Sequence, residues 1–387
     1  MLYTGIKKLT DEAMRLRTLE RLIKLREQLD NDIPEKTAES SLLLATWNIR
    51  AFGKDGRTQE SLYYIAEILS RFDLIAIQEV KGQREGLEKV MALMGKNWSY
   101  IATDVNTAEG GNGECIAFLY DTNKVSFKNM AGEIVLPNTQ TFVNPAVEKK
   151  KEEAEKKGVE YVESTDEKQR VQFARTPFCV SFQAGWFKFN IATVHIYYGT
   201  DSKEIDRQRR EDEIRTIAEF LSKRADDEKN NYIILGDFNI PKAGDRYMKA
   251  LESGGFHIPE PLKKHPSNLG ETKHYDQIAF NLQLSDDKKM VLFDENVQRS
   301  GAFNWSKSVY RTIDYADYMP LMDKKYREDE EKAKKYFKDS YRTNQMSDHL
   351  PLWVELKVDF SDQYLKGLKA NYEKGEKIAK KAAAKKK

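Results

Sequence analysis

Asp237 and Asn239 are the residues in this sequence whose types and spacing point most directly to chemistry. They follow the apolar run 232–235 and Gly236 in the stretch NYIILGDFNI. The run predicts a buried strand that stops at the glycine, where the backbone can turn. Alternation along an extended chain then places the carboxylate and the amide on the same side, at the C-terminal edge of a sheet. An Asx turn that closes a surface strand is the alternative interpretation.

Oxygen-bearing side chains also follow two earlier apolar runs. Residues 42–49 read LLLATWNI and predict a strand that ends in Trp47 and Asn48, and residues 74–77 are followed by Gln78 and Glu79. A helical pattern with one apolar face lies between the two runs. Two strands joined by a helix form a parallel pair, so Asn48 and Glu79 are expected at one edge of the sheet. The apolar face of the helix comprises Leu62, Ile65, Ile68 and Leu69.

Histidines and carboxylates lie beside four other apolar runs. His195 stands near the end of TVHIYYG, and His349 precedes a strand in SDHLPLWVEL. Glu114 opens the run in GECIAFLY, and Asp276 stands in HYDQIAF. A histidine with an ordinary pKa of about 6.5 can accept or donate a proton near neutral pH. Taken singly, however, His195 is more often a satisfied strand histidine than a catalyst, and a lone glutamate such as Glu114 is usually solvated.

A series of helices and strands is expected to position these residues. Residues 10–30 predict a helix that Thr10 caps, and its packing against the main domain is favoured over a role in binding a partner. Two runs around a short turn at Ala184 and Gly185 predict a hairpin, and residues 203–223 predict another helix. The expected hairpin strands are 178–182 and 186–196, and the face of the first helix comprises Leu19, Leu22, Ile23 and Leu29.

Three charged stretches interrupt or follow this pattern. Residues 148–170 have little apolar content and predict an exposed excursion without a core, and residues 323–340 predict a second charged excursion. The Lys-rich end of the chain is expected to be a solvated tail, with contact to nucleic acid or anionic lipid as the alternative. The expected organisation is an N-terminal helix and linker at 1–41, one domain at 42–358, and the tail at 359–387.

Composition bounds the classes of protein that are compatible with this chain. Its 387 residues, 40% of them hydrophobic, suffice for a sizeable core. The formal charge of +2 indicates no global attraction for a polyanion. Cys115 and Cys179 lie in apolar runs, and two such residues make neither a disulfide framework nor a cysteine metal site. No stretch resembles a signal peptide or a membrane span, so a soluble, cytoplasmic protein is expected.

Taken together, six motifs resemble the endonuclease/exonuclease/phosphatase superfamily, the metal-dependent phosphoesterases that include DNase I. The motifs ATWNIR, IQEVKG, TVHIYYG, GDFNI, HYDQIAF and SDHLPLWVEL occur in the family's order between about residues 42 and 357. The resemblance implies a four-layer α/β/β/α sandwich with two central mixed β-sheets and an active site at one end. Mg²⁺ is the expected cofactor, with Mn²⁺ or Ca²⁺ as substitutes, because hard cations take carboxylate and amide oxygens.

The resemblance also implies a role for each motif residue. Two His–carboxylate dyads, Glu114 with His195 and Asp276 with His349, are expected to move protons. Family precedent makes His349 the base and His195 the acid. Arg175, in FARTP, resembles a phosphate-contacting arginine, with structural pairing as the alternative. Asn48 and Glu79 match the metal-binding pair, whereas Asp237, Asn239 and Asp348 match positions that hold a second cation or orient phosphate and water.

The motif details favour the DNase I-like branch over its relatives. His195 and HYDQ depart from the abasic-site endonucleases, and GDFN and Tyr275–Gln277 depart from the inositol-polyphosphate phosphatases. The first hypothesis is therefore a Mg²⁺-dependent nuclease that acts on DNA, ahead of RNA. One alternative is a phosphoesterase that acts on a phospholipid head group or a small metabolite, which the near-neutral charge favours. Another is an inactive scaffold or binding protein that keeps the fold, with the N-terminal helix or the tail contacting a partner.

Overall fold

β1 (Ser41–Phe52) is the strand around which the layers of the computed structural model are arranged. Its Leu42 and Leu44 belong to a core between two sheets, whereas Leu43 and Ala45 pack against helices on the outer face. Successive side chains of a strand alternate between its two faces, so an unbroken apolar run marks a strand that is buried on both sides. The run LLLA therefore requires a second sheet on one face and helices on the other.

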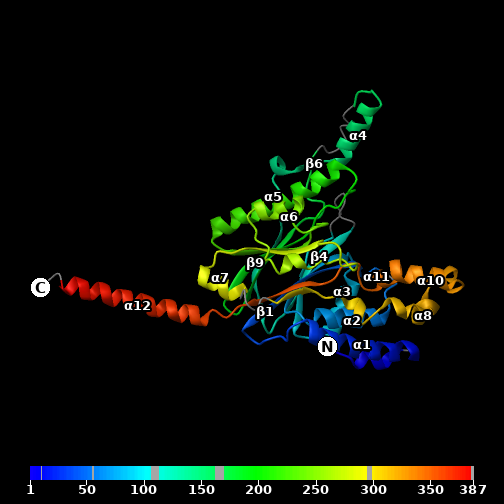
Figure 1. Ribbon diagram of the computed structural model, residues 1–387, viewed down its shortest axis with the longest axis horizontal. Coiled ribbons are helices and arrows are strands. Elements are labelled where there is room, and N and C mark those ends of the chain that lie inside the picture. The colour runs from blue at the N-terminus through cyan, green and yellow to red at the C-terminus, as the bar shows by residue number, and fades with distance from the viewer. Residues whose placement is uncertain (10, 55, 106–112, 162–169, 294–298, 385–387) are drawn as a thin grey trace.

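The structure describes residues 1–9, 11–54, 56–105, 113–161, 170–293 and 299–384, and it confirms the predicted α/β/β/α sandwich (Figure 1). Sheet A has the strand order β12-β13-β1-β2-β4-β3, and sheet B has the order β11-β10-β9-β8-β5. Both are mixed, because β1 and β2 are parallel, as are β9 and β10. The other strands of sheet A are β12 (Ser300–Ala302), β13 (Leu352–Lys357), β2 (Leu74–Lys81), β4 (Glu114–Asp121) and β3 (Trp98–Ala102). Sheet B contains β11 (Asp276–Asn281), β10 (Asn231–Asp237), β9 (Phe187–His195), β8 (Phe178–Ala184) and β5 (Val125–Glu133), and a small third sheet pairs β6 (Phe142–Val143) with β7 (Arg170–Val171).

Helices cover the outer faces of both sheets (Figure 1). α1 (Glu12–Asp32), α2 (Gln59–Leu69) and α3 (Glu85–Met94) share a hydrophobic cluster with sheet A, and α5 (Glu204–Glu228) and α6 (Arg246–Ser253) share one with sheet B. α4 (Pro145–Lys156) projects from the sheet B side, and α7 (Asp286–Phe293) lies near β13. Short helices α8 to α11 lie together beside sheet A, at Tyr315–Tyr318, Lys324–Arg327, Glu330–Tyr336 and Arg342–Gln345.

The N-terminal helix packs against the domain, but its buried face differs in part from the prediction. Asp11 caps α1 by accepting a hydrogen bond from Met14 N at 3.0 Å, while the predicted cap Thr10 lies outside the described residues. The buried stripe is Leu22, Leu25 and Leu29, whereas Leu19 and Ile23 are 44% and 58% exposed. The prediction for Leu19 and Ile23 is therefore wrong, because α2 and the segment around Trp305 cover only the neighbouring stripe.

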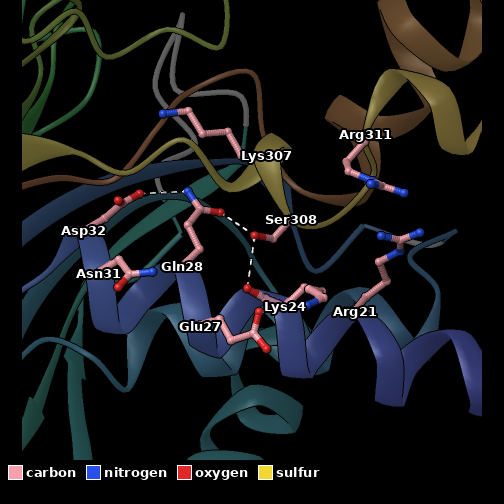
Figure 2. Close-up of a pocket in the computed structure, with 9 residues that line it drawn as sticks. All are labelled: Arg21, Lys24, Glu27, Gln28, Asn31, Asp32, Lys307, Ser308 and Arg311. Carbon is pink, nitrogen blue, oxygen red and sulfur yellow. Dashed lines mark hydrogen bonds and ion pairs between the residues drawn. The ribbon is translucent and has the colours of Figure 1, made fainter.

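Figure 2 shows how the outer side of α1 meets residues 307–311 around a cavity of about 320 Å³. Gln28 Nε2 donates to Asn304 O at 3.0 Å, and Ser308 Oγ donates to Gln28 Oε1 at 2.5 Å. The adjoining Trp305 is buried, and its Nε1 donates to His349 O at 3.4 Å. The N-terminal helix is thus connected through one short segment to a residue of the predicted site.

The charged stretches differ in how much they contribute to the core. Residues 148–161 are without a buried side chain, and residues 162–169 of the predicted excursion lie outside the described part of the chain. By contrast, Ala333 and Phe337 of the stretch 323–340 are fully buried, and Phe337 stacks on Tyr318 at 5.4 Å. This second stretch is therefore part of the core beside sheet A. The domain boundaries after residues 41 and 358 stay a prediction.

The end of the chain forms the helix α12 (Ser361–Ala384), which extends away from the body of the protein (Figure 1). It follows β13 directly, so it leaves the sandwich where β13 ends. None of the described helices combines the length and the apolar character needed to cross a membrane.

Candidate active site

Three neighbouring strands of sheet B bring a histidine and two aspartates to one edge. Asp237 is the last residue of β10, and it pairs in register with His195, the last residue of β9. On its other side Asp237 pairs with Asp276, the first residue of β11. All three side chains are buried. The pairing register of sheet B therefore places side chains from three separate sequence motifs next to one another.

Gly236 permits the close pairing of β10 with β9. It has a φ of +130°, and a Cβ at this position would lie 2.1 Å from Val194 O. The predicted end of the strand at Gly236 is wrong by one residue, because β10 continues to Asp237 and turns only afterwards. Asn239 takes a φ of +55°, and its N–H donates to Asp237 Oδ1 at 2.9 Å. The Asx turn considered as an alternative is therefore present, but it is buried and not on the surface.

Sheet A contributes Asn48 from β1 and Glu79 from β2, which are parallel neighbours as predicted. Asn48 Nδ2 donates to Glu79 Oε1 at 3.1 Å and, across the two sheets, to Asp237 Oδ2 at 2.9 Å. The strands do not end at these residues. The register shifts between Asn48 and Phe52, and Glu79 has a φ of +62°. The irregularity redirects the side chains while pairing continues, as a bulge does.

His195 lies between two carboxylates. Its Nδ1 is 3.3 Å from Glu114 Oε2, and its Nε2 is 3.6 Å from Asp237 Oδ2. Arg175 Nε and Lys81 Nζ approach the same Glu114 carboxylate at 3.1 and 3.3 Å. Burial raises the pKa of Glu114, but His195, Arg175 and Lys81 outweigh burial and lower this pKa to about 2. Glu114 is therefore a fixed negative charge beside the imidazole at neutral pH.

His349 forms the second pair of an imidazole with a carboxylate. Its Nδ1 lies 2.8 Å from Asp276 Oδ2, and its Nε2 lies 3.8 Å from Asp237 Oδ2. Burial lowers the pKa of His349, but the Asp276 and Asp237 charges outweigh burial and raise this pKa to about 10. The ring of Tyr275 covers the imidazole at 5.5 Å between centroids. The environment thus favours the imidazolium form of His349.

Two buried serines that the sequence analysis did not identify hold this second pair in place. Ser267 Oγ accepts from Asp276 N at 2.8 Å, and Ser267 O accepts from Leu350 N at 2.6 Å. Ser347 Oγ donates to Asn48 O at 2.6 Å and accepts from His349 N at 3.0 Å. Ser347 is the first residue of the motif SDHLPLWVEL, so the motif itself was a signal that could have identified it. Ser267 lies in a loop without any pattern that distinguishes it.

Three predicted site residues make contacts that do not by themselves establish their predicted roles. The Asp348 side chain is 50% exposed and lies 4.0 Å from Arg50. Asn239 Nδ2 donates to Ile196 O at 2.8 Å. Arg175 pairs with Glu114, as its alternative interpretation expected, and this contact is compatible with a further contact to phosphate. The metal and phosphate roles of Asp348, Asn239 and Arg175 therefore stay predictions.

One buried oxygen atom, Asn48 Oδ1, is available as a ligand for a divalent cation. Within the described residues no cluster of three or more histidine, cysteine or acidic side chains has the spacing of a metal site. Asn48 Oδ1, however, is buried without a hydrogen-bond partner, next to two carboxylates that its Nδ2 contacts. A buried acceptor without a donor is costly, and an amide oxygen is a ligand that Mg²⁺ accepts. This orphaned oxygen is compatible with a cation beside Asn48, and the metal roles of Asn48 and Glu79 stay predictions.

Comparison with known proteins identifies the family. The model of the Endonuclease/Exonuclease/phosphatase family matches residues 45–349. This range contains every predicted site residue, from Asn48 to His349. The chain belongs to this family. Its members are hydrolases that act on phosphoester bonds. No curated protein matches the sequence.

Several solved structures of the family resemble this fold at low sequence identity. A family member from Bacteroides thetaiotaomicron is 16% identical, with a TM-score of 0.47 over 83% of this chain and 98% of its own. The human Nocturnin catalytic domain with bound sulfate is 14% identical, with a TM-score of 0.47 over 82% and 95%. A mannosyl-6-phosphatase from Bacteroides thetaiotaomicron is 16% identical, with a TM-score of 0.46 over 81% and 99%.

Proposed function

We propose that this protein is a Mg²⁺-dependent phosphodiesterase and that it acts as a DNase I-like nuclease on DNA. One observation carries the proposal. Asp237 Oδ2 lies 3.6 Å from His195 Nε2 and 3.8 Å from His349 Nε2, and the Nδ1 of each ring lies beside a carboxylate of its own. Two oriented imidazoles that face one position can serve the two ends of a hydrolysed bond.

Asn48 and Glu79 are the proposed ligands of Mg²⁺, with Asp237, Asn239 and Asp348 orienting phosphate and water or holding a second ion. When bound, Mg²⁺ neutralises charge that develops on phosphate oxygens. Arg175 is the proposed contact to a phosphate oxygen. Its Nε already binds Glu114, which fixes the direction of the guanidinium.

The proposed reaction is direct attack by water on phosphorus. The water oxygen forms the new P–O bond, the bond to the leaving oxygen breaks, one imidazole accepts the water proton, and the other donates a proton to the leaving oxygen. The resemblance makes His349 the base and His195 the acid. The raised pKa of His349 opposes that division, because an imidazolium donates a proton and does not accept one. The pH profiles of variants at the two positions decide between the assignments.

The proposed substrate is DNA, and a small phosphoester or phospholipid head group is the second candidate. The observation that favours the second candidate is the formal charge of +2, since nucleases often carry a basic groove. The same fold and the same site chemistry serve both substrates. A comparison of turnover on long DNA with turnover on small phosphoesters therefore distinguishes the two candidate substrates better than any feature of the site.

The decisive experiment offers the purified protein supercoiled plasmid with Mg²⁺, beside a phospholipid and a nucleotide substrate. We expect relaxed and linear plasmid with Mg²⁺, none with EDTA, and a loss of at least about 100-fold in His349→Ala and Asp237→Ala. His257→Ala is the matched control, because His257 is exposed and lies outside the site. Cleavage of only the small substrates selects the second candidate. Unchanged turnover in His349→Ala removes the mechanism, and no turnover on any substrate selects the scaffold alternative.

A further inference from the structure

α12 carries an apolar stripe that the described part of the chain leaves mostly exposed. Tyr364, Leu365 and Tyr372 are 49%, 60% and 74% exposed, and Leu368 is half-buried. At 100° per residue these four side chains fall within an arc of about 100° around the helix axis. The helix runs away from the body of the protein beyond its first turns (Figure 1). An exposed stripe of this regularity is typical of a binding surface.

The part of α12 whose side chains the structure describes, up to Lys374, carries three lysines and two acidic residues. The helix contains six lysines against three acidic residues, and three further lysines follow in the sequence at 385–387. Lys366, Lys369 and Lys374 are exposed, and the helical repeat places them away from the stripe. α12 therefore has aromatic and aliphatic residues on one side. The other side carries Lys366, Lys369 and Glu373, which lies 4.0 Å from Lys369, in a helix whose sequence has a net positive charge.

The stripe continues onto the body of the protein through Trp186. This residue occupies the turn between β8 and β9, is 51% exposed, and packs its ring 5.4 Å from the ring of Tyr364. Its N–H donates to Val358 O at 3.1 Å, which fixes the turn beside the start of α12. Tryptophan and tyrosine side chains are suited to the boundary between lipid and water, because one part of each ring system is apolar and another is polar.

We propose that α12 and Trp186 bind the protein to an anionic membrane surface. The helix lies in the plane of the interface, with the stripe in the boundary between head groups and acyl chains and the lysines beside acidic head groups. Nucleic acid would use the lysines but leave the stripe exposed. A second copy of the chain would cover the stripe but bring two helices of the same net positive charge together. An anionic membrane is the one of these three occupants that uses both faces.

The proposed anchor lies far from the candidate active site. Trp186 immediately precedes β9, and His195 ends it, so the length of a nine-residue strand, about 25 Å, separates the two. Loss of the anchor should therefore leave hydrolysis of a soluble substrate unchanged. The proposal goes beyond the proposed function, and membrane binding can be measured without any turnover.

The test is sedimentation of the full chain with phosphatidylcholine vesicles, with and without phosphatidylserine, in EDTA. We expect partitioning that requires phosphatidylserine. Leu365→Gln combined with Tyr372→Gln should lower the partition coefficient at least tenfold, and Lys366→Gln combined with Lys369→Gln should lower it by about fivefold for each lysine. Ala370→Gln is the matched control, because this exposed residue lies outside the stripe and should bind as the wild type does.

Four results would overturn the proposal. The first is equal partitioning onto vesicles with and without phosphatidylserine, or none onto either. The second is unchanged partitioning of the stripe variant. The third is a wild-type dimer in light scattering that the stripe variant loses while vesicle binding is absent, which would assign the stripe to self-association. Duplex DNA that binds the wild type in EDTA but not the lysine variant, again without vesicle binding, would assign the helix to nucleic acid.

Discussion

His349 Nδ1 lies 2.8 Å from Asp276 Oδ2, although 73 residues separate the two in sequence. The contact exists because Asp276 opens β11 beside Asp237, while the loop before β13 returns to the same edge. Ser267 ties the two together, since it accepts from Asp276 N and from Leu350 N. The dyad is therefore a product of tertiary structure, and its electrostatics can be tested directly.

Asp276→Asn should lower the pKa of His349. The carboxylates of Asp276 and Asp237 raise this pKa to about 10, so removing the closer charge moves it down toward the ordinary value of 6.5. Titration of the imidazole by NMR in metal-free protein measures the change, with the signal assigned by its absence in His349→Ala. The wild-type ring should remain protonated at pH 8. A wild-type ring that titrates near pH 6.5 would contradict this account of the dyad.

Gly236→Ala should destabilise the protein by about 2–6 kcal/mol. An alanine would combine the strain of a φ of +130° with a methyl group 2.1 Å from Val194 O, and each effect costs roughly 1–3 kcal/mol. Urea denaturation measures the free energy of unfolding. Gly132→Ala in β5 is the control, because an added Cβ there meets nothing within 4 Å and the change should stay below about 1 kcal/mol.

The comparison of these residues shows what local pattern can and cannot predict. Apolar runs mark buried strands, so the sequence predicts strand ends near Asp237, His195 and Asp276. The pairing register of the strands then brings these three residues together. Helical periodicity predicts Leu19 and Ile23 on the buried face of α1, but both are exposed, because periodicity does not reveal which stripe a neighbouring element covers. Ser267 was missed because its role arises from two backbone contacts, which leave no trace in residue type.

Both cysteines should be unreactive in the folded protein. Cys115 and Cys179 are buried, and burial raises the pKa of Cys179 to about 12. At pH 8 only about one Cys179 thiol in ten thousand is then ionised, and that fraction is inaccessible. A chromogenic disulfide reagent should detect no thiol in the native state and two after denaturation. Rapid reaction of one thiol without denaturant would show that the layer around it opens readily.

Glu79→Gln should abolish binding of Mg²⁺ in an assay that does not depend on turnover. Glu79 Oε1 accepts from Asn48 Nδ2, and Oε2 accepts from Ala51 N at 2.8 Å, so a glutamine of the same size removes the charge and can keep one of these two contacts. An ion that binds only the folded state raises the melting temperature as its concentration rises above the dissociation constant. The wild type should therefore melt higher as Mg²⁺ is added, and Glu79→Gln should not. Glu355→Gln is the control, because this buried glutamate pairs with Leu43 near the opposite end of sheet A. A full Mg²⁺ response in Glu79→Gln would exclude this carboxylate as a ligand and leave Asp237 and Asp348 as the charges available to the ion.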